Sequence, residues 1–265
     1  MIRSAMSPAP ATLRITRLGT TTRDRLDRAP ERAGSVHSVF ERAVNVLWHD
    51  GRLVTLHGPG ALEAPFAVAL SRLPERGALT AGMPIARCAI DWRDAECIGL
   101  DMPEGALGFA PGALPQPPPA AALGSSAGLG LLARGLATRD ANTVAMAALA
   151  LVGLGEGLTP SGDDCLVGAL SAIHRLAPAW LARSEGLRAW LAAAAESGTT
   201  AIAHGFLLEA LEGRFAEPVL AVLTAESDAS ARLAALRLLA MGATSGADTL
   251  CGIWLACQAL APPRP

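Results

Sequence analysis

Hydrophobic and polar residues alternate along much of the first 110 residues, a pattern typical of half-buried β-strands. Two hairpin patterns stand out, at residues 38–57 and 85–101, and each contains a polar turn. Before them, only residues 12–17 have the pattern of a short strand. We therefore expect an irregular N-terminal arm over residues 1–34 and an antiparallel β domain over residues 35–110.

A proline-rich stretch separates this region from one with helical spacing. Five of the nine residues 111–119 are proline, a density that excludes a helix or a central strand. We place a Pro-rich linker at residues 111–122 and an α-helical domain at residues 123–265. The expected fold class is α+β, an N-terminal antiparallel β domain followed by a C-terminal α-helical bundle. The helices are predicted at residues 123–138, 140–152, 163–176, 178–195, 199–211, 217–223, 227–241 and 247–260.

One phrase occurs twice in the helical region. GLGEGLTPSGDDCLVG covers residues 153–168, and GATSGADTLCG covers residues 242–252. In both, a Gly-rich loop leads into an apolar helix. Backbone N–H groups at a helix start lack partners within the helix and attract anions. The bundle is therefore expected to carry two Gly-rich loop–helix repeats.

The repeated serines and aspartates also permit a purely structural interpretation. Ser161-x-x-Asp164 and Ser245-x-x-Asp248 have the spacing of capping boxes, each worth about 1 kcal/mol of helix stability. That interpretation leaves Asp163 and the alternating glycines unexplained. We favour a binding site in which loop amides and hydroxyls hold an anion. Its carboxylates would either hold Mg²⁺ or accept hydrogen bonds from substrate N–H groups.

The candidate site has catalytic, metal-binding and substrate-binding members. Asp163, Asp164 and Asp248 are the catalytic candidates, and Asp163 with Asp164 is also the candidate metal site. Asn45 is an unusual polar residue in a strand pattern, and it either belongs to the site or faces solvent. The substrate-binding candidates are Asn45, Gly155, Gly157, Thr159, Ser161, Gly162, Thr199, Thr244, Ser245 and Gly246.

Composition narrows the possible chemistry and partners. All 22 basic residues are arginine, which excludes a Schiff-base lysine and a Walker-type phosphate loop. The net charge of −2 gives no sign of a nucleic-acid partner. The five cysteines lack metal-like spacing, and we find neither a secretory signal nor an apolar run long enough to span a membrane. We therefore expect a cytoplasmic protein with free thiols.

The two phrases, together with HSVFERAVNVLWHDGRLVTL near the start of the chain, resemble the AllH-like family. The resemblance covers residues 35–262 and is most specific at GLTPSGDD. It implies a subunit of the oxamate carbamoyltransferase of allantoin catabolism. That enzyme moves a carbamoyl group between oxalurate plus phosphate and oxamate plus carbamoyl phosphate. The resemblance also implies FdrA-like and AllG-like protein subunits as partners.

The resemblance can be followed residue by residue. The chain departs from the family at Ala243, where a polar residue is frequent, and at Ala64-Pro65, where an Asn-Pro pair is frequent. Two alternatives to a carbamoyltransferase subunit remain, a stand-alone metal-dependent hydrolase of a small amide and a non-catalytic interaction subunit whose loops only cap helices. The positions that match the family signatures are Asn45, Gly157, Thr159, Pro160, Ser161, Gly162, Asp163, Asp164, Thr244, Ser245, Gly246 and Asp248.

Overall fold

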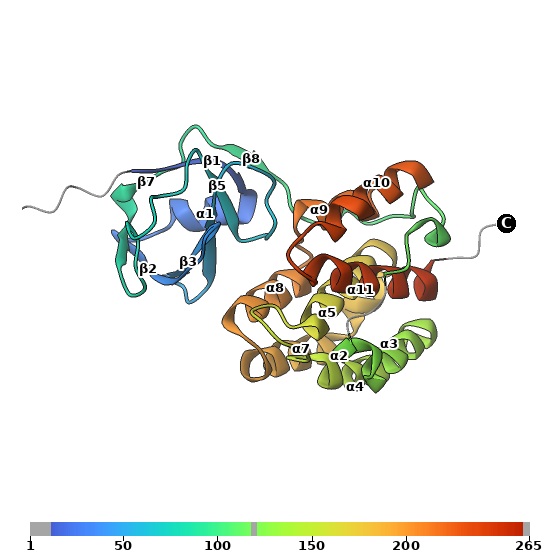
Figure 1. The fold of residues 1–265 in the computed structure, drawn as a ribbon. Helices are drawn as coiled ribbons and strands as arrows, with labels where there is room; N and C mark the ends of the chain where they lie inside the picture. Colours follow the sequence, from blue (N-terminus) through green and yellow to red (C-terminus); the bar gives the residue numbers. More distant parts are fainter. Residues whose placement is uncertain (1–11, 118–120, 262–265) are drawn as a thin grey trace, which may run out of the picture. The chain divides into compact units, whose positions relative to one another are not determined.

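The computed structural model of the protein describes residues 12–117 and 121–261. A β-sheet and a set of helices form two compact units, which confirms the α+β fold class (Figure 1). The described residues of the two units come from Met1–Leu62 with Phe66–Gly99, and from Glu63–Pro65 with Leu100–Pro265.

The first unit is built on a sheet with the strand order β6-β2-β3-β4-β5-β1-β7, and β8 also pairs with β1. Its helical elements are α1 (Thr20–Asp27) and the 3₁₀ helix η1 (Arg87–Ala89). The strands are β1 (Leu13–Gly19), β2 (Arg32–Val39), β3 (Ala43–Trp48), β4 (Leu53–His57), β5 (Ala67–Leu70), β6 (Pro84–Ala86), β7 (Ile90–Asp91) and β8 (Glu96–Ile98).

The sheet is mixed, not antiparallel throughout as predicted. The hairpin pairings β2–β3 and β3–β4 are antiparallel, in agreement with the alternating pattern. However, β4–β5, β1–β7 and β1–β8 are parallel. Two of these pairings involve the first strand, which pairs with segments more than fifty residues away in the sequence, and β4–β5 joins strands that are not linked by a hairpin; local pattern contains no information on either kind of pairing.

The predicted irregular arm over residues 1–34 is ordered where the structure describes it. β1 stands where the short strand was expected, and α1, which was not predicted, follows it. Residues 1–11 of the arm lie outside the described residues. Leu18 and Leu26 from this segment belong to the hydrophobic core of the first unit, and their burial stabilises the segment against the sheet.

The second unit contains most of the predicted helices with small shifts at their ends, but the predicted helix at residues 123–138 is interrupted before α3, whose N-cap Ser126 has an extended backbone. The predicted helix at residues 178–195 is interrupted at Ser184, whose backbone leaves the helical region (φ −99°, ψ 49°), and so forms two helices. The helices are α2 (Ala121–Gly124), α3 (Ala127–Thr138), α4 (Ala141–Leu151), α5 (Ser161–Leu176), α6 (Pro178–Arg183), α7 (Glu185–Gly198), α8 (Ala201–Leu211), α9 (Glu217–Leu223), α10 (Asp228–Leu239) and α11 (Ser245–Leu260).

The described part of the proline-rich segment belongs to the helical unit. It begins with the 3₁₀ helix η2 (Pro111–Ala113). Leu114 is buried in the helical core, and the Ala113 carbonyl accepts a hydrogen bond from Arg232 Nε at 3.2 Å. The two units therefore join in the sequence near residue 99, before the linker expected at residues 111–122.

The helical unit contains a duplicated helix–loop–helix, formed by α4–α5 and by α10–α11. The first glycine of each second helix packs on the end of the helix before it. A Cβ atom on Gly162 would lie 1.9 Å from the Leu151 carbonyl oxygen, and one on Gly246 would lie 1.9 Å from that of Leu238. Only glycine allows this approach, so both copies fold into the same hairpin.

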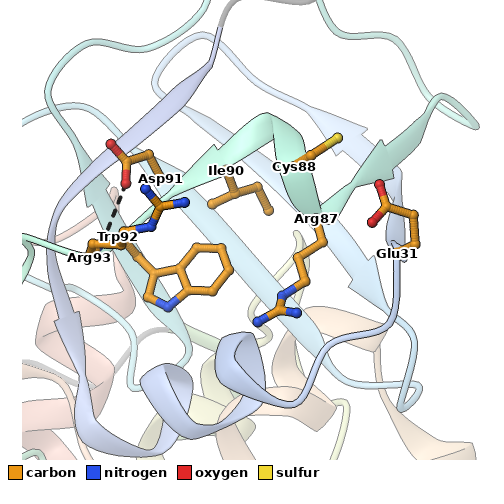
Figure 2. Close-up of a pocket in the computed structure, with 7 residues that line it drawn as sticks. All are labelled: Glu31, Arg87, Cys88, Ile90, Asp91, Trp92 and Arg93. Atoms are coloured by element: carbon orange, nitrogen blue, oxygen red, sulfur yellow. Dashed lines mark hydrogen bonds between the residues drawn. The ribbon is translucent and has the colours of Figure 1, made fainter.

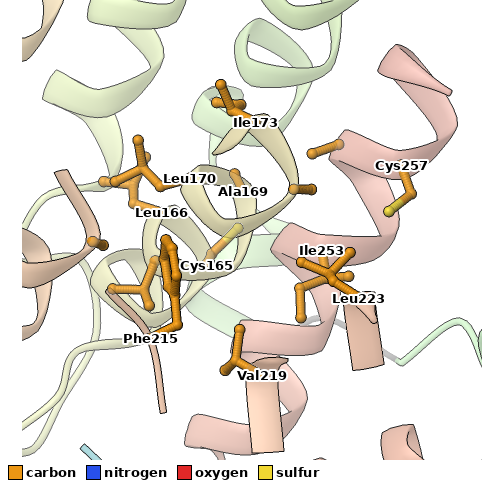
Figure 3. Close-up of a cluster of buried hydrophobic side chains, with 14 of the residues drawn as sticks. Cys165, Leu166, Ala169, Leu170, Ile173, Phe215, Val219, Leu223, Ile253 and Cys257 are labelled. Carbon is orange, nitrogen blue, oxygen red and sulfur yellow. The ribbon is translucent and has the colours of Figure 1, made fainter. Parts of the chain in front are cut away.

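The two copies also pack against each other in a reciprocal way, α5 on α11 (Figure 3). A Cβ on Gly168 of the first copy would lie 2.0 Å from the backbone carbonyl oxygen of Thr249 in the second. A Cβ on Gly252 of the second copy would lie 1.9 Å from the Cys165 oxygen of the first. Since Cys165 and Thr249 occupy equivalent positions, just after the repeated aspartate, the contact has the self-complementary form of a two-fold interface.

Across residues 12–117 and 121–261, no helix combines the length and the apolar character needed to cross a lipid bilayer.

Candidate functional site

The two repeated loops meet at the starts of α5 and α11. Thr159 Oγ1, from the first loop, lies 2.8 Å from Ser245 Oγ, in the first turn of α11. Both hydroxyls also hydrogen-bond to the carboxylate of Asp164. The first copy and the second copy therefore contribute side chains to one hydrogen-bonded cluster.

The alternating glycines are required by the backbone of the first loop. Gly153, Gly155 and Gly157 have φ angles of 71°, 115° and 93°, in the left-handed region that other residues rarely adopt. A Cβ on Gly153 would also lie 2.1 Å from the carbonyl oxygen of Gly198. The glycines thus shape the loop, and Gly155 and Gly157 are exposed at its tip.

The capping-box interpretation of the repeated serines is wrong. The N-cap residues are Pro160 for α5 and Thr244 for α11, and neither makes a side-chain cap hydrogen bond. Ser161 and Ser245 are instead the first residues of their helices. Helix capping therefore does not explain why serine occurs at both positions.

The amides of two predicted binding residues are already satisfied within the loops. Gly162 N donates to the Leu154 carbonyl at 2.8 Å, and Gly246 N donates to the Met241 carbonyl at 3.1 Å. These glycines therefore stabilise the turn, and their N–H groups do not point outward as the sequence analysis expected.

Asp163 anchors the first loop to the segment before α8. Its carboxylate accepts hydrogen bonds from Gly153 N at 3.1 Å and from Thr199 Oγ1 at 2.5 Å. Burial raises the pKa of Asp163, while the hydrogen bonds from Thr199 and Gly153 lower it. The buried Asp163 is thus paired with the partly buried Thr199, which suits a positioning role better than contact with a substrate.

The neighbouring Thr200 also contributes to the site, and the sequence analysis did not select it. Thr200 Oγ1 donates to the Leu158 carbonyl at 2.5 Å and accepts from Ala203 N as the N-cap of α8. In the sequence, a threonine directly after Gly198-Thr199 and before a helix indicates a helix cap. Nothing in the sequence indicates its contact with the loop at Leu158.

Asp164 and Asp248 differ from Asp163, because each retains a carboxylate oxygen without a partner. Their side chains are 7% and 1% exposed, and the Oδ2 atom of each has no hydrogen-bond partner among the described residues. Burial raises the pKa of Asp164 to about 8. The hydrogen bonds from Ser245 and Thr159 oppose this rise, and the charges of Asp248 and Asp163 add to it. Buried polar atoms are normally satisfied, so these two oxygens mark the candidate site.

The structure does not favour the predicted metal site at Asp163 and Asp164. The Asp163 carboxylate already accepts hydrogen bonds from Gly153 and Thr199, which leaves Asp164 to coordinate an ion alone. In the described part of the chain, no three His, Cys, Asp or Glu side chains are grouped so that they could hold a metal. Neither observation supports the stand-alone metal-dependent hydrolase.

Two thiols lie on the helices below the carboxylates, where α5 packs on α11. Cys165 is fully buried in the cluster shown in Figure 3. Its hydrogen bond with Cys251, together with burial, raises the pKa of Cys165 well above that of an ordinary thiol. A thiol held in this protonated form is a poor nucleophile, so Cys165 serves the packing of the two helices.

Asn45 is neither exposed nor without partners. In the first unit its Oδ1 accepts a hydrogen bond from Thr55 Oγ1 at 2.7 Å, and its Nδ2 donates to Ser38 Oγ at 3.1 Å. These contacts join β2, β3 and β4 on one face of the sheet, where Asn45 is 4% exposed. The solvent-facing interpretation is therefore wrong, and a substrate-binding role for Asn45 stays a prediction.

The first unit also has a cavity of about 380 Å³, which contains none of the predicted site residues (Figure 2). The guanidinium carbon of Arg87 lies 5.5 Å from the centre of the Trp92 ring. Trp92 Nε1 donates to Asp27 Oδ1 at 2.8 Å. These contacts stabilise the wall of the cavity, and they give Trp92 and Arg87 a structural role.

The fold and the site together define an α+β protein with a duplicated helix–loop–helix, which carries two buried carboxylate oxygens without a hydrogen-bond partner among the described residues. We compared the sequence with models of known protein families. Residues 151–257 match the family described as oxamate carbamoyltransferase subunit AllH, and residues 11–93 match the AllH family N-terminal domain. The chain belongs to the AllH family. The comparison with solved structures gives no match.

Proposed function

We propose that this chain is a subunit of an oxamate carbamoyltransferase-like complex and that it binds a small anionic amide between the two repeated loops. One observation carries the proposal: each copy of the motif supplies a buried carboxylate, and each carboxylate has an Oδ2 atom without a partner in the described structure. The family description, which names a transferase subunit, supports the choice of substrate class.

The chemistry of oxamate, oxalurate and carbamoyl phosphate suits these groups. Each molecule has amide N–H donors at one end and an anion at the other. The Oδ2 atom of Asp248 would accept an N–H group and that of Asp164 would also contact the amide, because nothing else in the described structure satisfies them. The loop at Gly155 and Gly157 would receive the anion, since both glycines are exposed and a Cβ on Gly157 would meet nothing within 4 Å.

The proton on Asp164 suits a neutral carbonyl or amide better than a bare anion. With its pKa near 8, Asp164 is mostly protonated at neutral pH, so it would donate a hydrogen bond while Asp248 accepts one. Such a pair holds the planar amide in a fixed orientation, which is the main requirement for group transfer between two bound substrates. Asp163 and Thr199 would hold the loop in position without touching the substrate.

The remaining roles concern the assembly. A chain that supplies one binding site would act with protein subunits of the FdrA-like and AllG-like kinds, and we place the complex in the cytoplasm. Turnover of oxalurate or oxamate would then need the partner subunits. Turnover by this chain alone would contradict the subunit role and favour a stand-alone enzyme.

Calorimetric titration of oxamate and oxalurate into the full-length chain tests the binding proposal. We expect saturable binding that Asp248→Asn weakens at least about tenfold, because the amide cannot donate to the NH₂ group of asparagine. Glu196→Gln, which changes an exposed carboxylate on α7, is the matched control and should bind as the unaltered chain does. Absence of binding to the unaltered chain, or equal binding by Asp248→Asn, would contradict the proposal.

A further inference from the structure

The repeated aspartates of the two copies, Asp164 and Asp248, differ in the hydrogen bonds that they receive. Asp164 and Asp248 are each the fourth residue of their helices, α5 and α11. Asp164 receives hydrogen bonds from Ser245, the first residue of the opposite helix, and from Thr159, which lies one residue before the N-cap Pro160. In this half of the site the protein itself supplies two hydroxyl donors.

The other half lacks a hydroxyl at the corresponding position. Since Thr244 is the N-cap of α11, it corresponds in the structure to Pro160 and not to Thr159. The residue that corresponds to Thr159 is therefore Ala243, which has no hydroxyl to donate. Asp248 Oδ2 is buried and has no hydrogen-bond partner in the described structure.

The serine of this half also remains available. Ser161 corresponds to Ser245, is 7% exposed, and makes no side-chain hydrogen bond to any described residue. A Cβ on Gly155 would lie 3.3 Å from Ser161 Oγ, so the loop tip passes directly over this hydroxyl. One donor, Ser161 Oγ, and one acceptor, Asp248 Oδ2, are thus unused in the same half of the site.

We infer that an unsubstituted carbamoyl group, –CO–NH₂, binds in this second half and takes the place of the hydroxyl that Ala243 lacks. Its NH₂ group donates to Asp248 Oδ2, and its carbonyl oxygen accepts from Ser161 Oγ and from the carboxyl of Asp164. This inference rests on the proposed function and deepens it, because it states which end of the anionic amide enters the site and in which copy of the motif.

Electrostatics favours this orientation over the reverse one. A carboxylate or phosphate placed beside the buried carboxylate of Asp248 would be repelled by like charge. The same position accepts N–H donors readily, and a planar group with N–H donors and a carbonyl acceptor matches Asp248 Oδ2, Ser161 Oγ and the Asp164 carboxyl. The charged end of the ligand then lies toward the exposed loop at Gly155 and Gly157. The site should therefore require a free –NH₂ group.

Ligand analogues test the requirement for –NH₂. Oxamate should bind the full-length chain, whereas oxalate, which has no amide, and N,N-dimethyloxamate, which has no N–H donor, should bind at least about tenfold more weakly. Equal affinity for oxamate and N,N-dimethyloxamate would overturn the inference and leave the proposed binding of small anions intact. No binding of oxamate at all would overturn the proposed function and, with it, this inference.

A threonine at residue 243 tests whether the carbamoyl group binds beside Asp248. Ala243→Thr should supply Asp248 with the donor that Thr159 supplies to Asp164, and we expect at least about tenfold weaker oxamate binding with an unchanged or higher Tm. Ala243→Val has the same shape without the hydroxyl and should not raise Tm. Oxamate binding by Ala243→Thr equal to that of the unaltered chain would overturn the inference.

Ser161→Ala provides a second route if Ala243→Thr does not fold. The change removes the donor to the carbamoyl oxygen and should weaken oxamate binding at least about threefold while the selectivity for –NH₂ over –N(CH₃)₂ persists. Unchanged affinity in Ser161→Ala would overturn the placement of the carbonyl oxygen.

Discussion

The two copies of the helix–loop–helix pack their helices in the same way but differ just before the N-cap of the second helix, where the first copy has Thr159 and the second has Ala243. Both use a glycine to pack the second helix on the end of the first, and both place an aspartate in the first turn of a helix. In the first copy, Thr159 and Ser245 satisfy much of Asp164. In the second, Ala243 leaves Asp248 without that donor. The duplicated scaffold is thus asymmetric, and in our proposal this asymmetry gives a small ligand one defined way to bind.

The largest effect is expected from a substitution that forces the two copies of the motif apart. Gly168→Ala would place a methyl group 2.0 Å from the Thr249 oxygen, so α5 and α11 must move apart. We expect a loss of about 3 kcal/mol or more in the free energy of unfolding, measured by denaturant titration.

Gly130→Ala is the matched control, because Gly130 is an exposed glycine within α3 and its Cβ would meet nothing within 4 Å. This change should stabilise the protein by about 0.5–1 kcal/mol, as alanine is the better helix former. If Gly168→Ala were as stable as Gly130→Ala, the close reciprocal packing of the two copies would be refuted.

A smaller effect is expected from releasing the anchor that exists only in the first copy. Thr199→Val removes the hydroxyl that donates to Asp163 at 2.5 Å, and the second copy has Ala247 in place of Asp163. We expect a loss of about 1–3 kcal/mol in unfolding free energy, because a buried carboxylate loses a partner.

Thr138→Val serves as the control for Thr199→Val. The Thr138 hydroxyl donates only to backbone carbonyls near the end of α3 and sits at an exposed position, so its loss should cost less than about 1 kcal/mol. Similar losses in the two variants would show that Asp163 is not an anchor of the loop.

The ionisation of Asp164 should make the stability of the folded protein depend on pH. Because burial raises its pKa from 3.8 to about 8, the folded protein retains a proton that the unfolded chain releases between these values. Stability should therefore be fully present below about pH 4 and should fall as the pH rises toward 8. The slope is at most about 1.4 kcal/mol per pH unit. Asp164→Asn should flatten this dependence in thermal unfolding measured from pH 5 to 8, and a dependence identical to that of the unaltered chain would contradict the burial of the carboxyl.

The helices were the most predictable part of the fold. α9 spans the predicted residues 217–223, and α5 and α11 start within two residues of the predicted positions. These segments have a strong apolar period and clear ends, so local sequence determines them. The sheet was less predictable, because β1 pairs with β5, β7 and β8, and such long-range pairing depends on packing that no local pattern encodes.

The candidate site was predictable in its location but not in the roles of its residues. The repeated phrase indicated Asp164 and Asp248, and the structure brings Asp164, Thr159 and Ser245 into one cluster. The anchoring role of Asp163 depends on a contact with Thr199, thirty-six residues away. The correspondence of Thr244 with Pro160 appears only when the helix ends are known, since the sequence motif aligns the two threonines.

The central claim is that one ligand engages both copies of the motif at once. A double-mutant cycle on oxamate affinity, with Asp164→Asn, Asp248→Asn and the double variant, measures this directly by calorimetry. The account predicts strong coupling, in which the double variant loses little more affinity than the weaker-binding single variant. Losses that simply add, or single variants that bind as the unaltered chain does, would show that Asp164 and Asp248 do not share a ligand.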